Sequence, residues 1–311
     1  MRVLFYGTPE FALATLEALL AHHEVVTVVT QPDRPAGRGQ KTGAPPVKRR
    51  AEEAGVPVLQ PARLRDPGWP ERLAACRPDV AVVVAFGQIL TRAVLDVPAR
   101  GSINVHASLL PRYRGAAPIA WAIARGESVT GVTTFQMDPG MDTGPMLLRE
   151  STPIGPDETA GELAARLSEI GARVLLRTLG ELDALTPMAQ DDAAATMAPR
   201  LRKEDGWLRW SESARSLADR VRAMNPWPGA ATMTPAGRVI VWRATAEPGS
   251  DAVAVPGTLV LGVDGAVAVA TGDGRLRPIL VQPESRRAVA WADFLRGARL
   301  GPGARFTEIQ S

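Results

Sequence analysis

Apolar residues in the first half of the chain follow two alternating patterns. Continuous apolar runs cover residues 3–6, 25–29 and 80–85, each the length of a strand that is buried on both faces. Between the first two runs, apolar residues from Phe11 to Leu20 recur at the spacing of one helix face. Buried strands that alternate with helices predict an α/β domain with a mostly parallel sheet, covered by helices on both sides.

Shorter elements continue this first pattern. A helix is predicted at 46–54, and further strands at 56–59, 102–107 and 132–137. A long helix is then predicted over residues 159–184, because its apolar residues fall on or near one face: Leu163, Leu167, Ile170, Val174 and Leu182.

The character of the chain changes after this helix. Residues 189–203 have no apolar period and are interpreted as a linker. Beyond them, short alternating segments are separated by glycine-rich turns, which favours a small β-barrel. The sequence therefore predicts a first domain at 1–188, the linker at 189–203 and a second domain at 204–311.

Composition narrows the class of protein. The chain has 311 residues, of which 45% are hydrophobic and 22% charged, as in a globular protein. No apolar run reaches the roughly 18 residues of a membrane-spanning helix. Cys76 is the only cysteine, so the chain forms no internal disulfide, and a reducing cytoplasm is the expected location. The net charge of +3 permits a polyanionic partner without requiring one.

The informative chemistry begins on the strand predicted at 102–107. Asn104 and His106 are two residues apart, so both side chains point to the same face near the strand's carboxyl end. A carboxamide and an imidazole side by side supply hydrogen-bond donors for an oxygen that becomes negative during a reaction. No motif positions a nucleophilic serine or cysteine, which favours direct transfer to an incoming nucleophile.

A carboxylate completes this candidate site. Asp142 lies between Gly140 and Gly144 in a turn that follows a strand, where it can orient His106. Each residue alone has a plainer interpretation, since a lone histidine on a strand or an aspartate in a glycine-rich turn is often structural. The first turn, at 7–11, lacks the glycine pattern of a dinucleotide site, and no Walker-type phosphate loop is present.

Two stretches taken together resemble a known family. Residues 104–118, NVHASLLPRYRGAAP, and residues 140–144, GMDTG, resemble the folate-dependent formyltransferases. Four further segments, at 7–11, 31–39, 83–87 and 225–230, make the chain most similar to those members that act on methionyl initiator tRNA. The resemblance extends from Val3 to about Phe294.

The resemblance implies both an architecture and a reaction. It implies a Rossmann-like domain followed by an OB-like barrel, with 10-formyltetrahydrofolate as formyl donor and co-substrate and no metal. The acceptor is the α-amino group of methionyl initiator tRNA, and a monomer is expected. Asn104, His106 and Asp142 match the family's catalytic residues.

The resemblance also implies binding residues. The folate-binding positions are Ser108, Leu109, Leu110, Pro111, Phe86, Gly87, Gln88, Ile89, Leu90, Gly140 and Met141. Phe86, Gln88 and Thr91 depart from the residues common in the family, and we expect them to change the packing of the pocket and not its chemistry. The tRNA-binding positions are Arg38, Lys41 and Arg34, in a basic stretch whose plainer interpretation is a solvated charged face.

Other functions are compatible with parts of this pattern. A formyltransferase of the same fold acting on an amino sugar nucleotide shares the three catalytic positions, and so does a formyltetrahydrofolate hydrolase. An enzyme acting on glycinamide ribonucleotide would be shorter by about one domain. A non-enzymatic nucleic-acid-binding protein would use the barrel and its arginines, but it would have no need of the catalytic residues.

Overall fold

The computed structural model describes residues 1–36, 41–249, 254–262 and 264–309. The chain divides into two compact units, which are described separately below. Unit 1 comprises Met1–Gly115, Val129–Pro153 and Ala164–Ala198, and unit 2 comprises Ala116–Ser128, Ile154–Leu163 and Pro199–Ser311. The second unit therefore takes in two segments that precede the predicted linker.

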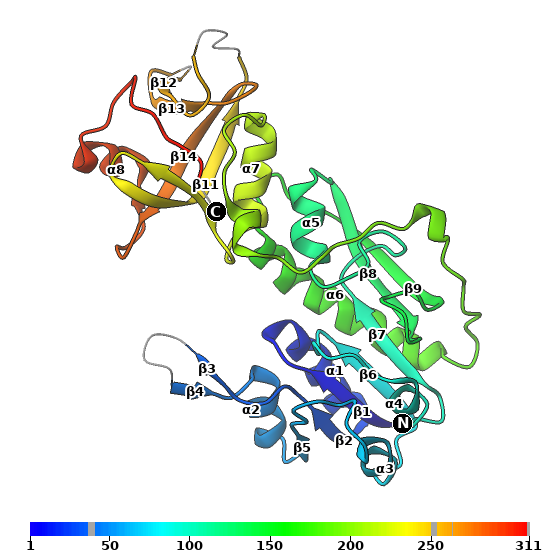
Figure 1. The fold of residues 1–311 in the computed structure, drawn as a ribbon. Coiled ribbons are helices and arrows are strands. Elements are labelled where there is room, and N and C mark those ends of the chain that lie inside the picture. The colour runs from blue at the N-terminus through cyan, green and yellow to red at the C-terminus, as the bar shows by residue number, and fades with distance from the viewer. Residues whose placement is uncertain (37–40, 250–253, 263, 310–311) are drawn as a thin grey trace. The chain divides into compact units, whose positions relative to one another are not determined.

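A seven-stranded sheet forms the centre of unit 1 (Figure 1). The first five strands in its order are parallel: β5 (Val58–Leu59), β2 (Glu24–Val29), β1 (Arg2–Gly7), β6 (Val80–Val84) and β7 (Ser102–His106). The antiparallel strands β8 (Val129–Gln136) and β9 (Met146–Pro153) extend the other edge. This arrangement confirms the predicted Rossmann-like, mostly parallel sheet.

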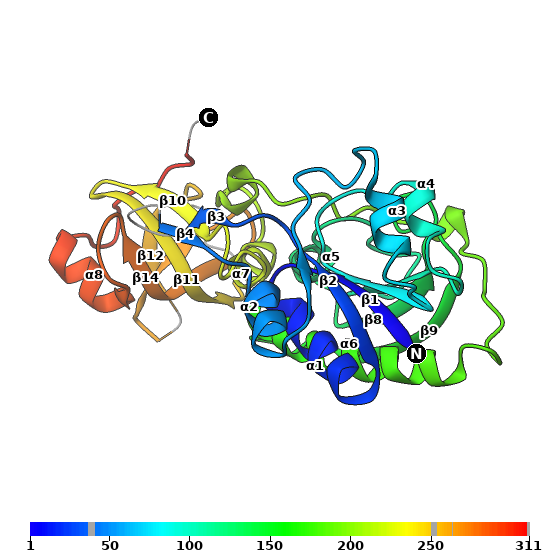
Figure 2. The same ribbon diagram turned by 90° about the horizontal axis from the view of Figure 1, so that it is seen from below.

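Helices cover both faces of this sheet (Figure 2). Helices α1 (Leu13–His22) and α6 (Ala160–Glu181) lie on one face, and α3 (Trp69–Ala74) and α4 (Arg92–Leu95) lie on the other. Helix α6 approaches β7 closely, since a Cβ added at Gly171 would lie 2.9 Å from Cγ1 of Val105. Helix α2 (Pro46–Glu53) follows a two-stranded hairpin, β3 (Arg34–Ala36) and β4 (Lys41–Gly43), which the sequence did not predict.

Unit 2 is built on a curved antiparallel sheet. Its order is β10 (Ala230–Thr234), β11 (Gly237–Glu247), β14 (Arg275–Pro283), β13 (Val267–Ala270) and β12 (Leu259–Leu261), with β15 (Val289–Ala290) paired to β14. Helices α5 (Pro118–Ala124), α7 (Ala214–Ala223) and α8 (Trp291–Ala298) complete the unit. This antiparallel sheet confirms the predicted small β-barrel domain, in the form of a half-barrel.

The core of this half-barrel holds aromatic residues from distant parts of the chain. Trp210, Trp291 and Phe306 are nearly fully buried there, and the Trp210 indole donates to Oγ1 of Thr232 at 3.0 Å.

In the part of the chain that the structure describes, no helix has the length and apolar character needed to cross a membrane.

Candidate active site

The sheet determines which way the candidate catalytic side chains point. Asn104 of β7 pairs with Val83 of β6, and paired residues of parallel strands face the same side. Val83 packs in the apolar cluster beneath α3 and α4, whereas Val105 faces Gly171 of α6 on the other side. Asn104 and His106 therefore share the α3–α4 face at the carboxyl end of β7, as their spacing predicts.

The His106 ring is held between two oxygen atoms. Its side chain is buried, and Nε2 lies 2.9 Å from the carbonyl oxygen of Tyr113. A carbonyl oxygen only accepts, so Nε2 carries a proton and donates it. Nδ1 lies 3.6 Å from Oδ2 of Asp142, and the edge of the ring meets Phe135 with the centroids 6.4 Å apart. The carboxylate and the imidazole predicted to act together are thus neighbours.

Asp142 occupies a tight turn with a left-handed backbone. Its φ is +55°, a region that residues with a Cβ rarely adopt and that aspartate tolerates better than most. Its Oδ2 also accepts from the backbone N–H of Gly115 at 2.8 Å. A Cβ at Gly144 would lie 1.8 Å from the carbonyl oxygen of Gln136, so the turn closes only because glycine stands there.

The carboxamide of Asn104, unlike the His106 ring, has no hydrogen-bond partner among the described residues. The side chain is partly exposed. An amide with free donors beside a buried imidazole is available to bind an oxygen of a ligand.

The predicted folate-binding segment 108–111 is hydrogen-bonded to the neighbouring strand, β8. Oγ1 of Thr133 donates to the carbonyl oxygen of Ser108 at 2.7 Å and accepts from the N–H of Leu110 at 3.2 Å. The Ser108 hydroxyl donates to the carbonyl oxygen of Arg112, and Leu110 is buried against Phe135. Ser108 and Leu110 thereby shape this segment from within, while Leu109 and Pro111 are partly exposed.

The second predicted folate-binding segment, residues 86–90, follows β6. Phe86 and Leu90 are buried in the apolar cluster of that face, and Gln88 bonds the N–H of Leu64 and the carbonyl of Pro61. The exposed positions are Gly87, with φ +82°, and Ile89, which is 82% exposed. In this segment the groups open to solvent are the Ile89 side chain and the backbone of Gly87.

The turn before Asp142 presents a similar exposed apolar group. Met141 is 63% exposed and Gly140 is exposed. Two large hydrophobic side chains, Ile89 and Met141, therefore stand uncovered on the segments predicted to bind folate.

The predicted tRNA-binding residues fall at the β3–β4 hairpin. Arg34 is exposed on β3 and its guanidinium donates to Oε1 of Gln31 at 3.1 Å. Lys41 begins β4, and Arg38 lies outside the described residues. Asp33 precedes the hairpin, and hydrogen bonds from Lys48 and then Gln60 hold the pKa of its carboxyl below the usual value.

Sequence comparisons place the chain among known proteins. A family model described as formyl transferase matches residues 1–179, and a model of the formyl transferase C-terminal domain matches residues 200–299. The chain is 50% identical to the methionyl-tRNA formyltransferase of Citrifermentans bemidjiense over 97% of its own length and 95% of the relative's. It is also 50% identical to that of Sorangium cellulosum, over 97% and 98% of the two chains.

The chain belongs to the methionyl-tRNA formyltransferases, within the formyl transferase family. Members of this family are formyl-transferring enzymes that use folate derivatives. These identities cover nearly the whole chain and confirm the resemblance found in its motifs.

Solved structures of the same fold extend the comparison. An N-formyltransferase from Helicobacter canadensis, in complex with folinic acid and dTDP-3-aminofucose, has a TM-score of 0.65 at 16% identity and covers 89% of this chain and 98% of its own. HypX from Aquifex aeolicus, in complex with tetrahydrofolic acid, has a TM-score of 0.60 at 16% identity, covering 100% of this chain and 51% of its own. At these identities the likeness concerns the fold.

Several residues that complete the site were not predicted individually. Tyr113 and Gly115 provide backbone groups to His106 and Asp142, and both lie inside the motif at 104–118. Gln190 bonds the backbone of the Asp142 turn from the stretch interpreted as a linker. No local pattern identifies such a residue, because its partners are distant in sequence.

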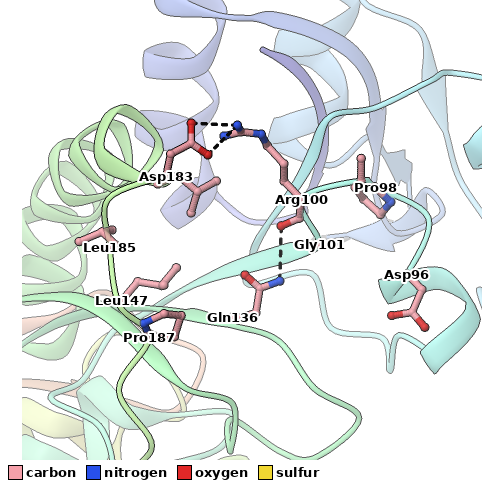
Figure 3. A pocket seen from close by; sticks show the side chains of 11 residues that line it. Asp96, Pro98, Arg100, Gly101, Gln136, Leu147, Asp183, Leu185 and Pro187 are labelled. Carbon is pink, nitrogen blue, oxygen red and sulfur yellow. Dashed lines mark hydrogen bonds and ion pairs between the residues drawn. The ribbon is translucent and has the colours of Figure 1, made fainter.

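A hollow in unit 1 lies away from these residues (Figure 3). Its volume is about 510 Å³, and Arg100, Gln136 and Asp183 are among the side chains that line it. It adjoins Gly101 at the amino end of β7, whereas His106 is at the carboxyl end.

Among the described residues, no three histidine, cysteine, aspartate or glutamate side chains are grouped so that they could hold a metal ion.

Proposed function

We propose that this chain transfers the formyl group of 10-formyltetrahydrofolate to the α-amino group of methionyl initiator tRNA. The proposal rests on the pairing of His106 with Asp142, beside an Asn104 carboxamide that has no hydrogen-bond partner among the described residues. The chain is also 50% identical to a methionyl-tRNA formyltransferase. The product is N-formylmethionyl-tRNA, which serves translation initiation.

The reaction is an acyl transfer through a tetrahedral intermediate. The neutral amine of the methionyl group attacks the formyl carbon, and the carbonyl oxygen becomes an oxyanion. Asn104 Nδ2 donates to this oxygen together with Nδ1–H of the doubly protonated His106 ring, because Nε2–H already donates to the carbonyl oxygen of Tyr113. One such donor changes the rate by about 10²–10³.

Proton transfer completes the exchange. The new bond joins the amine nitrogen to the formyl carbon, and the bond that breaks joins this carbon to N10 of the folate. The amine loses a proton and N10 gains one, so a group that accepts and returns a proton is required. Asp142 takes this part, directly or through water, because its Oδ2 faces the reacting side of His106.

The folate is proposed to lie among the three loops that follow β6, β7 and β8. Ile89 and Met141 offer uncovered apolar surface for the flat pterin ring, and the backbone of Gly87 offers polar groups at its edge. The buried members of the predicted set, Phe86, Leu90 and Leu110, set the shape of the loops.

The tRNA is proposed to contact both predicted domains. Residues 1–188 hold the donor and the reacting groups, and residues 204–311 bind the tRNA body. Arg34, Lys41 and Arg38 of the basic stretch approach phosphates of the acceptor end. We propose that the enzyme acts in the cytoplasm as a monomer.

Ion pairs limit which other basic residues serve this purpose. Lys48 and Arg50 follow the hairpin but already pair with Asp33 and Glu17. Arg277 of the barrel pairs with Glu247 and Asp264. These three guanidinium and ammonium groups are less available to phosphates than Arg34.

A formylation assay with two charged tRNAs tests the proposal. Purified protein and 10-formyltetrahydrofolate are incubated with methionyl initiator tRNA or methionyl elongator tRNA, and the blocked amine is measured. We expect rapid formylation of the initiator and much slower formylation of the elongator. Robust formylation of an amino sugar nucleotide, with neither tRNA modified, would refute the proposal.

A further inference from the structure

The turn that carries Asp142 is hydrogen-bonded by the side chain of Gln190, which is distant from it in the sequence. Nε2 of Gln190 donates to the carbonyl oxygens of Asp142, at 2.8 Å, and of Gly144, at 2.7 Å. Both hydrogens of the amide are thus used on the backbone of this turn.

Gln190 is itself oriented by a buried arginine. Nε and Nη2 of Arg114 donate to Oε1 of Gln190 at 3.0 and 2.9 Å, and Arg114 is 6% exposed. This pair of charge-assisted bonds fixes which end of the amide is the oxygen, and so makes Nε2 the donor toward Asp142. Arg114 directly follows Tyr113, whose carbonyl oxygen holds His106.

The same stretch of chain also holds the other side of the imidazole. Oγ1 of Thr196 accepts from the N–H of Tyr113 at 2.9 Å, and Arg114 exchanges two backbone hydrogen bonds with Thr196 and Ala198. A Cβ at Gly115 would lie 2.7 Å from the carbonyl oxygen of Ala198, so the two backbones are in close contact. Gln190, Thr196 and Ala198 therefore hold the groups on both sides of His106.

We infer that Gln190 is a positioning residue for formyl transfer and that it acts through Asp142. The predicted linker then supplies residues that support the catalytic site. The inference rests on the proposed function, because it assigns Gln190 the task of aiming the carboxylate that moves the proton. Gln190 touches no reacting atom. Its amide fixes the turn so that Oδ2 of Asp142 faces Nδ1 of His106 and the N–H of Gly115.

The consequence concerns turnover and not tRNA binding. A carboxylate that swings away from His106 leaves the tRNA-binding groups in place, together with the folate-binding segments 86–90 and 108–111. Misplacement of a reacting group by about 1 Å lowers a rate by as much as 10²-fold. Loss of the Nε2 donor should therefore lower kcat and leave KM for the tRNA unchanged.

Two substitutions remove the donor in different ways. Gln190→Glu keeps the size of the side chain and the oxygen that Arg114 binds, but it places an oxygen against the two carbonyls. Gln190→Met has a similar length and adds no charge. The matched control is Asp191→Asn, since Asp191 is exposed and, among the described residues, its side chain accepts only from the N–H of Ala193 in its own turn. Thermal melting verifies that each variant is folded.

Steady-state formylation of methionyl initiator tRNA supplies the readout. We expect kcat to fall about tenfold or more in both Gln190 variants, with KM for the tRNA within about twofold of the wild type. Asp191→Asn should retain the wild-type kcat. Folded Gln190 variants with a wild-type kcat, or with a loss confined to KM, would overturn the inference.

A double-mutant cycle separates this inference from the proposed function. If Gln190 acts through Asp142, Gln190→Met should lower the rate less than about twofold further once Asp142→Ala is present. Independent, multiplying losses would contradict the inference and leave the role of Asp142 intact. A wild-type rate for Asp142→Ala alone would instead refute the proposed catalytic role of this carboxylate.

Discussion

The imidazole of His106 is confined by acceptors on both sides, which gives it one orientation. Tyr113 fixes Nε2, and Asp142 faces Nδ1 at 3.6 Å. A ring confined in this way is already aligned when the substrate arrives, so little reorganisation accompanies the reaction. Asn104 adds a second donor on the same face of β7.

His106→Ala should lower kcat for formylation by at least about a hundredfold while the tRNA still binds. The reason is the loss of a donor to the developing oxyanion. Single-turnover formylation and a filter-binding assay measure the two effects. Asn104→Asp, which replaces the amide donor by an oxygen of the same size, should show a comparable loss. A near-wild-type rate in either variant would remove that residue from the mechanism.

The acidic residue before the β3–β4 hairpin provides a prediction about pH. Hydrogen bonds from Lys48 and Gln60 lower the pKa of Asp33, so its ionised form stabilises the folded state above the ordinary pKa of about 3.9. This contribution is lost as the pH falls through the lowered value. Lys48→Met should raise the pKa of Asp33 in a carboxyl NMR titration. Arg92→Met, which breaks the separate pair with Asp96, should leave it unchanged.

The sequence predicts that the side chains of Asn104 and His106 point to the same face, because alternate residues of a strand share a face. The contribution of Gln190 has no such pattern, since its partners Asp142 and Arg114 are 48 and 76 residues away in the sequence. An aperiodic stretch indicates only that no helix or strand face is being buried. It does not reveal hydrogen bonds made by single side chains.

Among the elements, the central parallel strands of the first domain were predicted well. The run at 80–85 became β6 and that at 102–107 became β7, each with nearly the predicted bounds. Strand β9 was missed because it lies at the edge of the sheet, where Arg149 and Glu150 interrupt the apolar pattern. Helix α8 and the hairpin β3–β4 are short, and their apolar patterns are too brief to be distinguished from turns.

The close packing of helix α6 against β7, the strand that carries Asn104 and His106, can be tested with two glycine substitutions. Gly171→Ala brings a methyl group within 2.9 Å of Val105 on β7, which should destabilise the fold by about 1–3 kcal/mol. Gly180→Ala lies in the same helix with no atom within 4 Å of the added group, and it should be neutral or stabilising by up to about 1 kcal/mol. Urea unfolding measures both. Equal stability of the two variants would contradict the packing described here.

At the scale of the whole molecule, tRNA recognition should depend on salt. Arg34 is exposed and has no carboxylate partner among the described residues, whereas Arg50 pairs with Glu17. Arg34→Gln should weaken kcat/KM for the tRNA and reduce its log–log salt slope by about 1, because one phosphate contact is lost. Arg50→Gln should leave the slope unchanged. Formylation rates across a series of salt concentrations provide the test, and equal slopes for wild type and Arg34→Gln would exclude Arg34 from the interface.

The most direct test of the whole account follows the formyl group itself. Isotope-labelled 10-formyltetrahydrofolate is incubated with the protein and methionyl initiator tRNA, and the amino acid released from the tRNA is identified by mass spectrometry. Labelled N-formylmethionine should form with the wild type and be nearly absent with His106→Ala. Label that stays on the folate, or leaves it as free formate in the presence of intact methionyl initiator tRNA, would contradict the account.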